Sequence, residues 1–331
     1  MADLDGDGRV DVLSGSWPGE LFLFRGRDEG GYAAPEMIHD KEGKVINIGG
    51  GIQEQPDGSF LVYGTTTTEE TAEGTWVVYQ EERVLKTPDK PVYTTGTASA
   101  IHAVDWDDDD DLDLLVGDIR GRVHLLENEG TSTAFSFGAA RQLEAAGQPL
   151  AVEGDAGPFV ADWDGDGDLD LIVGAGDGGV TLFRNDGTRS EPKLSAKAPL
   201  VTPSDTRDVP AEPRCGIRAK PCAADWDGDG DLDLLVGDYA TQKPALPEYT
   251  EEQKAEQDRI RQELEPIEAR YHELADLIYG RGEKESKEEL GKLEKEFEEI
   301  RKTVAALRGK LPPEYENHGW VWLFLRESPT K

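Results

Sequence analysis

A nine-residue acidic pattern occurs four times in the 331-residue chain, and each copy runs directly into a short apolar segment that ends in glycine. Aspartate stands at positions 1, 3, 5 and 9 of every copy. The copies span residues 3–11, 105–113, 162–170 and 225–233, and the closing glycines are Gly15, Gly117, Gly174 and Gly237. Because internal repetition of one supersecondary unit restricts a chain to repeat architectures, this feature constrains the fold most strongly.

The spacing of the copies indicates the size of the repeated unit. The copies at 105, 162 and 225 start 57 and 63 residues apart, whereas those at 3 and 105 are separated by 102 residues, close to two units. A degenerate unit is therefore expected near residue 52, where residues 52–64 have a strand-like segment and a closing glycine but lack the carboxylates. The sequence predicts five units, which start near 3, 52, 105, 162 and 225.

Each full unit is predicted to contain four short strands. One precedes the acidic loop, two follow it, and the fourth lies before the next unit; the third strands are expected at 20–24, 122–126, 180–183 and 320–324. Units of about 50 residues with four strands are typical of propeller blades. β-helix repeats are much shorter, and EF-hands need a helix on each side of the loop.

The predicted fold class is therefore all-β, a β-propeller of about five four-stranded blades over residues 1–331. The first unit lacks the strand before its loop, and the last unit ends just after its third strand. Either one blade is incomplete, or the chain is part of a larger propeller.

The segment between the last closing glycine and residue 320 predicts two helices. Residues 250–307 are rich in Glu, Lys, Arg and Leu, and their apolar residues step by threes and fours like the seam of a coiled coil. The seam residues are Ile260, Leu264, Ile267, Tyr271, Leu274, Ile278, Leu290, Leu293, Phe297, Ile300, Val304 and Leu307. An antiparallel α-helical hairpin is predicted at 247–312, inserted in the last blade.

Local signals mark the ends of these helices. Thr250 with Gln253, and Ser286 with Glu289, resemble capping boxes. Residues 280–282 supply the turn, and Pro266 is expected to kink or split the first helix.

The acidic loops predict calcium sites. Calcium takes six to eight oxygen ligands, and carboxylates crowded into one tight turn repel one another unless a cation neutralises them. Positions 1, 3, 5 and 9 would offer side chains and position 7 a carbonyl, while glycines at positions 4 and 6 permit the bend. The predicted ligands are Asp3, Asp5, Asp7, Arg9 and Asp11; Asp105, Asp107, Asp109, Asp111 and Asp113; Asp162, Asp164, Asp166, Asp168 and Asp170; and Asp225, Asp227, Asp229, Asp231 and Asp233. The loop 105–113 is the weakest of the four predictions, because Asp108 and Asp110 replace the glycines.

These loops, followed by Leu-x-Leu-Val-Gly or a close variant, resemble the FG-GAP or VCBS repeat of integrin α-subunit propellers and of many bacterial surface and secreted proteins. The resemblance covers units one, three, four and five well, unit two in outline, and the helical segment not at all. It implies a β-propeller whose calcium ions brace the blades in a structural role. Members of the family serve as adhesion and ligand-binding modules, and some are attached to polysaccharide-degrading enzymes.

The composition limits the partners. A formal charge of -34 argues against nucleic acid and anionic membranes, which would repel the protein. The sequence has no apolar run long enough to span or insert into a membrane, and no signal peptide is visible. An extracellular, cell-surface or periplasmic location is expected. Cys215 and Cys222 could pair in a small disulfide or be unrelated thiols.

The function is predicted to be recognition or adhesion, with a polysaccharide or protein as the ligand. Trp17, Arg120, Asp238 and Tyr239 are the candidate ligand-binding residues, because they fall in turns opposite the acidic loops, where an exposed aromatic beside polar groups suits sugars or peptides. The helical hairpin either packs along the propeller or docks a partner or a second copy. No catalytic set is predicted. The alternatives are a polysaccharide lyase or hydrolase, its non-catalytic accessory domain, or an architectural part of a larger surface protein.

Overall fold

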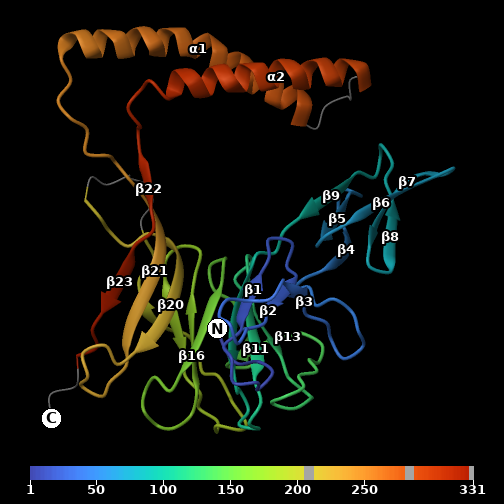
Figure 1. Cartoon of the computed structure of the whole chain (residues 1–331), viewed down its shortest axis with the longest axis vertical. Coiled ribbons are helices and arrows are strands. Elements are labelled where there is room, and N and C mark those ends of the chain that lie inside the picture. Colours follow the sequence, from blue (N-terminus) through green and yellow to red (C-terminus); the bar gives the residue numbers. More distant parts are fainter. Residues whose placement is uncertain (205–211, 280–286, 328–331) are drawn as a thin grey trace. The chain divides into compact units, whose positions relative to one another are not determined.

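The computed structural model describes residues 1–204, 212–279 and 287–327 (Figure 1). The fold is all-β, a β-propeller of small sheets, and its two helices form a hairpin inserted between strands of the last blade. The chain forms two compact units. The larger unit contains nearly all the strands, and the smaller one, chiefly residues 241–317, contains the helices.

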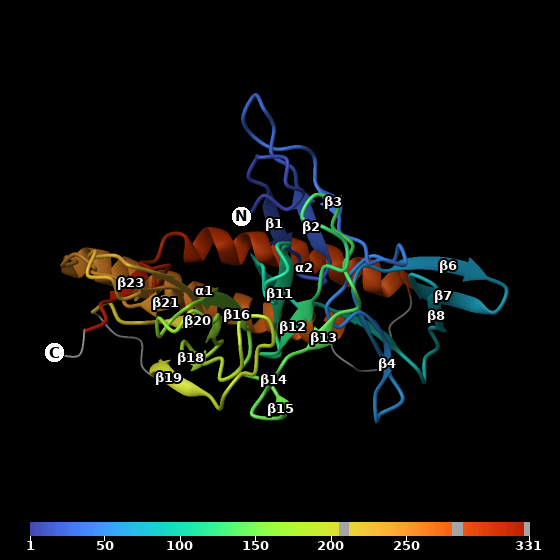
Figure 2. The same cartoon turned by 90° about the horizontal axis from the view of Figure 1, so that it is seen from below.

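Four sheets have the strand order of propeller blades, and we name them A to D in chain order. Blade A contains β1 (Val12–Gly15), β2 (Leu21–Phe24) and β3 (Glu36–Met37). Blade B contains β10 (Ser99–Val104), β11 (Asp113–Asp118), β12 (Val123–Leu126) and β13 (Arg141–Gln142), and the last three lie side by side in Figure 2. Blade C contains β16 (Gly157–Ala161), β17 (Asp170–Gly174), β18 (Val180–Phe183) and β19 (Ala198–Val201). Blade D contains β20 (Ile217–Ala224) and β21 (Asp233–Gln242), with both β22 (Glu316–His318) and β23 (Val321–Phe324) paired to β21.

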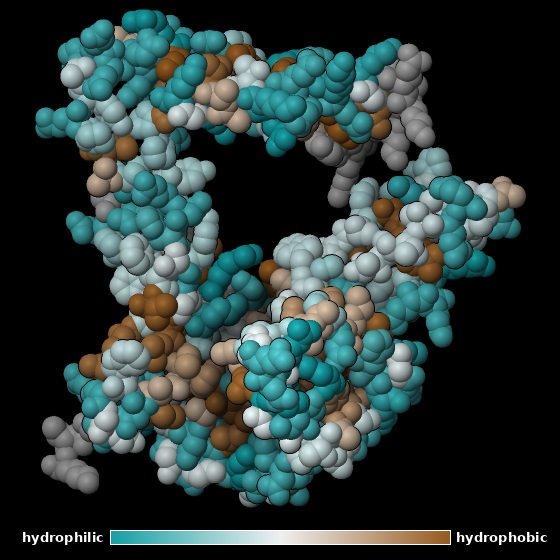
Figure 3. Space-filling view, viewed as in Figure 1, coloured by the Kyte–Doolittle hydropathy of each residue, from teal (hydrophilic) through white to brown (hydrophobic). Residues whose placement is uncertain are grey.

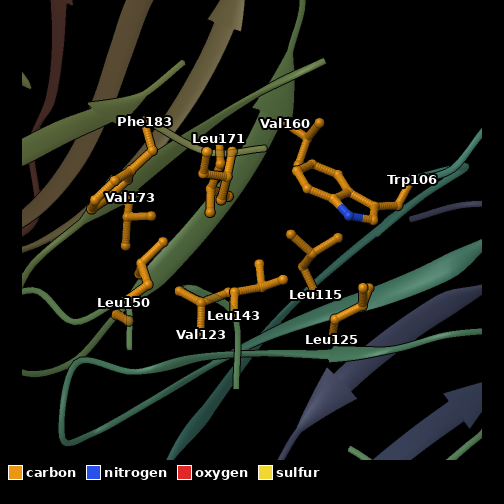
Figure 4. Close-up of a cluster of buried hydrophobic side chains, with 12 residues drawn as sticks. Trp106, Leu115, Val123, Leu125, Leu143, Leu150, Val160, Leu171, Val173 and Phe183 are labelled. Carbon is orange, nitrogen blue, oxygen red and sulfur yellow. The ribbon is translucent and has the colours of Figure 1, made fainter. Parts of the chain in front are cut away.

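Successive blades pack face to face through apolar side chains. Between blades B and C the cluster includes Trp106, Leu115, Val123, Leu125, Leu143 and Leu150 on one side and Val160, Leu171, Val173 and Phe183 on the other (Figure 4). Similar clusters join A to B and C to D. A short hairpin, β14 (Glu144–Ala145) and β15 (Gln148–Pro149), lies in the chain between blades B and C.

Three of the closing glycines lie where two blades approach each other closely. A Cβ at each of the three would lie 2.1 or 2.2 Å from a carbonyl oxygen of the next blade. The pairs are Gly15 with Ser99, Gly117 with Ala156, and Gly174 with Ala219. Only glycine permits this approach. The glycine that ends these apolar segments therefore allows one blade to contact the next. The first pair also shows that blade A packs directly on blade B.

The segment near residue 52 differs from the expected second blade. It contains the expected strands and Gly64, but it forms two three-stranded sheets, and one of its strand pairs, β5 with β9, is parallel. The sheets are β4 (Gly51–Glu54), β5 (Phe60–Tyr63) and β9 (Val92–Thr95), and β6 (Thr67–Thr71), β7 (Gly74–Tyr79) and β8 (Glu82–Leu85). Without an acidic loop this segment lacks the aspartate that joins strands in the other units, and the direct contact of A with B leaves it outside their interface.

The helices confirm the predicted hairpin. They are α1 (Glu251–Tyr279) and α2 (Lys287–Arg308). The predicted seam is their interface: Ile260 and Leu264 pack with Val304 and Leu307, and the Tyr271 ring stacks on Phe297 with centroids 4.8 Å apart. This pairing is antiparallel. In the described residues, no helix is both long and apolar enough to cross a membrane.

The first helix begins at the predicted capping box and is not split at its proline. The Thr250 N–H donates to Gln253 Oε1 at 2.9 Å, and the Gln253 N–H donates to Thr250 Oγ1 at 3.2 Å. Pro266 lies inside α1, which continues through it. Its missing N–H costs one helical hydrogen bond, and seam contacts on both sides of the proline hold the helix together. The predicted turn at 280–282 and the second capping box lie outside the described residues.

Candidate metal loops

The aspartate at position 1 organises the backbone of each acidic loop. Asp162 accepts hydrogen bonds from the N–H groups of Gly165, Asp166 and Gly167 at 2.9 to 3.0 Å. Asp166 in turn accepts one from the Asp168 N–H at 3.0 Å. The position 1 aspartates of the other three loops, Asp3, Asp105 and Asp225, bond to their loops in the same way. The repeated residues therefore specify one local turn that gathers carboxylates.

Positions 4 and 6 of the turn require a positive φ. Gly165 and Gly167 have φ values of 76° and 97°, and the aspartates at these positions in the loop 105–113, Asp108 and Asp110, have 65° and 69°. That loop therefore keeps the turn without its glycines, as expected. An L-residue pays a steric cost in this region that glycine does not.

Restoring the glycines should stabilise the protein. We expect Asp108→Gly and Asp110→Gly each to raise the free energy of unfolding by about 0.5–1 kcal/mol. Glycine relieves the steric strain of the left-handed backbone conformation. Part of this gain is lost because glycine gives the unfolded chain more conformational entropy. Urea unfolding in calcium-free buffer measures the change. Asp108→Asn is the matched control, because it removes the charge but keeps a side chain. If asparagine stabilises as much as glycine, charge and not backbone conformation is the cause.

The aspartate at position 9 is buried and joins two parts of its blade. Asp170 is 1% exposed; its Oδ2 accepts the Trp163 N–H at 3.0 Å, and its Oδ1 accepts the Asn185 N–H at 2.8 Å. Asp11, Asp113 and Asp233 make the same two contacts. The second donor follows the aspartate by 15 residues in the first three loops but by 93 in the last. The helical segment is thus inserted without disturbing this contact.

Three carboxylates converge in each loop. One oxygen from each lies within 4.8 Å of the others, and the sets are Asp3, Asp5 and Asp11; Asp105, Asp107 and Asp109; Asp162, Asp164 and Asp170; and Asp225, Asp227 and Asp229. Positions 1 and 3 are in every set, whereas the third member is position 5 in two loops and position 9 in the other two. The aspartates left out of the sets belong to the same loops.

Several of these oxygens lack a partner. The Oδ1 atoms of Asp5, Asp107 and Asp111 are buried and accept no hydrogen bond. Burial, together with Asp109 and Asp107, raises the pKa of Asp111 to about 6, and burial raises the pKa of Asp113 to about 7. A hard cation would give the buried oxygens a partner, since it takes carboxylate oxygens as ligands. It would also oppose the repulsion among the carboxylates, which favours their protonation. The residues therefore fit calcium.

Arginines neutralise three of the loops in part. In the loop 3–11, Arg25 pairs with Asp5, and Arg9, at position 7, pairs with Asp7. In the loop 162–170, Arg184 lies 3.3 Å from Asp164. The loop 105–113 has Glu127 where these loops have Arg25 and Arg184, directly after the third strand. Glu127 adds to the negative field that, after burial, raises the pKa of Asp107. Arg189 of blade C lies 3.8 Å from Asp105 and 3.7 Å from Asp108 and offsets part of this negative charge.

Two loops are also held by the next blade. Arg189 follows β18 in blade C and donates to the carbonyl oxygens of Asp105 and Trp106, at 2.7 and 3.2 Å. Arg326 follows β23 in blade D, donates to the carbonyl of Trp163 and lies 5.2 Å from the centre of its ring. The acidic loops are therefore part of the contacts between blades.

The candidate ligand-binding residues do not form one site. Trp17 is 62% exposed, and its carbonyl accepts the N–H groups of Thr97 and Ala98. The Arg120 guanidinium lies 4.1 Å from the centre of the Tyr63 ring. The turn that contains Arg120 contacts the same segment, residues 96–98, because the Ile119 N–H donates to the Thr97 carbonyl.

The other two candidates are in blade D. Asp238 accepts from Trp322 Nε1 at 2.7 Å and from the Trp320 N–H at 3.0 Å, which gives it a structural role, while Tyr239 is 41% exposed. No contact among the described residues joins this pair to Trp17 or Arg120. Cys215 and Cys222 are both free thiols, so they form no disulfide.

A pocket beside the loop 105–113 was missed from the sequence. It has a volume of about 820 Å³ and lies between strands of blade B and the turn after β18 of blade C. Its polar lining includes Asp107, Glu127, Arg141, Gln142, Glu144 and Lys193. Arg141 pairs with Glu127 at 2.6 Å. The sequence signal was weak, because the lining comes from irregular segments 20 to 90 residues apart.

Comparison with known proteins supports the repeat assignment. The family model of the FG-GAP-like repeat matches residues 105–173 and 162–236, which confirms the resemblance in this part of the chain. No curated protein sequence matches the chain. Similar solved structures include an Agrocybe aegerita lectin described as recognising non-reducing terminal N-acetylglucosamine (18% identity, TM-score 0.29, 72% of this chain and 61% of that one). Another is the periplasmic gluconolactonase of Pseudomonas aeruginosa (16% identity, TM-score 0.30, 72% and 64%). The chain spans less than two thirds of either protein.

Proposed function

We propose that this chain of FG-GAP-like repeats is a calcium-stabilised recognition module that binds a polysaccharide or protein ligand outside the cytoplasm. The observation that most directly supports this proposal is the convergence of three carboxylates in the acidic loop of each of four blades. Extracellular modules bind calcium with dissociation constants of roughly 10⁻⁴–10⁻³ M, which suits loops that are partly exposed.

The pocket beside the loop 105–113 is the proposed ligand site. At about 820 Å³ it falls in the range of roughly 300–1,000 Å³ that is typical of small-ligand sites. Its lining offers both donors and acceptors, as sugar hydroxyls require. Asp107 belongs to the carboxylate set and also lines the pocket, so a cation bound there would hold one wall of the pocket in place. The helical hairpin is proposed to be an accessory contact.

Retention on immobilised polysaccharides, with and without calcium, tests the proposal. We expect Arg141→Ala to weaken binding by roughly tenfold or more, which corresponds to about 1.4 kcal/mol. The variant removes a cationic donor from the pocket lining and leaves Glu127, which Arg141 contacts at the pocket wall, without this ion pair. Lys197→Ala, an exposed cation outside the pocket, is the matched control. Shortened polymer after incubation would favour a degrading enzyme instead.

The same assay separates the two faces of the blades. Trp17→Ala alters a turn at the opposite end of the strands from the acidic loops. Binding that is lost in Trp17→Ala but intact in Arg141→Ala would move the site to that face and contradict the pocket.

A further inference from the structure

The blades present equivalent apolar residues on the side that packs against the next blade, which we call the trailing face. On the third strands these are Leu21 and Leu23 in A, Val123 and Leu125 in B, Val180 and Leu182 in C, and Val321 and Leu323 in D. Those of blades A to C are 0–6% exposed, whereas Val321 is 73% and Leu323 41% exposed. At loop position 2, Trp106 is 3% exposed and Trp226 is 61% exposed. The trailing face of blade D therefore has the composition of a blade interface without its partner.

The covering side, which we call the leading face, is also repeated. Blade B covers A with Leu114, Val116 and Leu126; blade C covers B with Leu171, Val173 and Phe183; and blade D covers C with Leu234, Val236 and Phe324. The equivalent residues of blade A are Val12, Ser14 and Phe24, which are half-buried and belong to none of the described apolar clusters. One chain thus carries both halves of a blade interface.

The clustered aspartates of the acidic loop of blade D are more exposed than those of blades B and C. The loops of B and C are held by Arg189 and Arg326 from the next blade, but the three clustered aspartates of the loop 225–233 are exposed. The turn after β2 in blade A, which corresponds to the turn that carries Arg189 in C, has an exposed arginine, Arg27, followed by two exposed acids, Asp28 and Glu29. The match between the two surfaces therefore lies in their apolar residues.

We propose that the trailing face of blade D binds the leading face of blade A of a second copy of this chain. Apolar surface is visible over β20 and β23 in Figure 3, and an exposed apolar patch on a sheet face favours association. Two copies joined by two identical contacts of this kind form a closed dimer. They would carry twice the four blades found in the described residues of one chain, which lies at the upper end of the range of roughly 4–8 blades found in propellers. This inference does not depend on the proposed ligand.

Light scattering after size-exclusion chromatography, over a series of concentrations in calcium buffer, tests the proposal. The full chain is expected to be a dimer, and Val321→Lys and Leu323→Asp are each expected to raise the dimer dissociation constant by roughly tenfold or more. Leu246→Lys changes an equally exposed leucine outside the sheets and should leave the dimer intact. Thermal melting of each variant shows whether it is folded, and Val321, being the more exposed, carries little risk to the fold. A monomer at all concentrations, or a dimer that both variants leave unchanged, overturns the proposal.

Cross-linking identifies the surfaces. In a Cys215→Ser, Cys222→Ser background, one protein carries Ser14→Cys and a second carries Val321→Cys. Oxidation of the mixture should give a disulfide-linked heterodimer in excess of either homodimer. A protein with both new cysteines that links only within one chain would show that blades A and D of a single copy close on each other, and the proposal would be wrong.

Discussion

Removal of calcium is expected to lower the melting temperature of the protein by roughly 5–30 °C. At about 2 mM free calcium, a site with a dissociation constant in the extracellular range adds roughly 0.6–1.8 kcal/mol to the folded state. The four loops together would add roughly 2.5–7 kcal/mol, and one kcal/mol shifts the midpoint of a domain of this size by about 2–4 °C. The melting temperature should fall and not rise when calcium is removed, because crowded carboxylates with unpaired oxygens oppose folding until a cation binds them.

Calorimetry with a chelator titration measures this shift, and magnesium at equal ionic strength serves as one control. Magnesium demands octahedral geometry and keeps its waters, so it should restore little of the lost stability. The double variant Asp162→Asn, Asp164→Asn should reduce the calcium response by about a quarter, since it disables one loop of four. Asp89→Asn, an exposed carboxylate outside the loops, should leave it unchanged. A chelator that has no effect on the midpoint would contradict the assignment of all four loops.

Local and repeated features of the fold could be predicted from the sequence. The acidic pattern encodes its own turn, because Asp162 and Asp166 bond to backbone groups within five residues. The seam of the helical hairpin and the Thr250 capping box are likewise short-range patterns. The closing glycines marked the strand ends, although spacing alone did not show that three of them lie against the next blade.

Features that depend on distant segments could not be predicted in this way. The interval of 102 residues suggested a degenerate blade near residue 52, but the close approach of Gly15 to Ser99 brings blades A and B together without it. The pocket is lined by irregular segments with no periodic pattern. Pairing of Asp238 with Trp322 across the helical insertion gave no local signal. In each case a contact between residues far apart in the chain determines the outcome.

The aspartate at position 9 illustrates the difference between local features and contacts with distant segments. Asp170→Ala is expected to be among the most damaging substitutions outside the apolar core. The sequence suggests a metal ligand, whereas the structure shows a buried carboxylate that accepts the N–H groups of Trp163 and Asn185. Alanine would leave both donors without an acceptor. An unsatisfied buried donor costs about 1–3 kcal/mol, so the free energy of unfolding should fall by roughly 2–6 kcal/mol.

Denaturant unfolding of Asp170→Ala in chelator-treated buffer separates this role from metal binding, because the hydrogen bonds persist when calcium is removed. Asp168→Ala, two residues away and half-buried, should cost less than about 1 kcal/mol under the same conditions. Asp170→Asn should fall between them, since its single amide oxygen can accept from only one of the two donors. Equal losses for the two alanine variants would mean that the position 9 aspartate matters only through calcium. A large loss at Asp170 alone, seen without metal, would establish that the aspartate stabilises the blade directly, through the hydrogen bonds from Trp163 and Asn185.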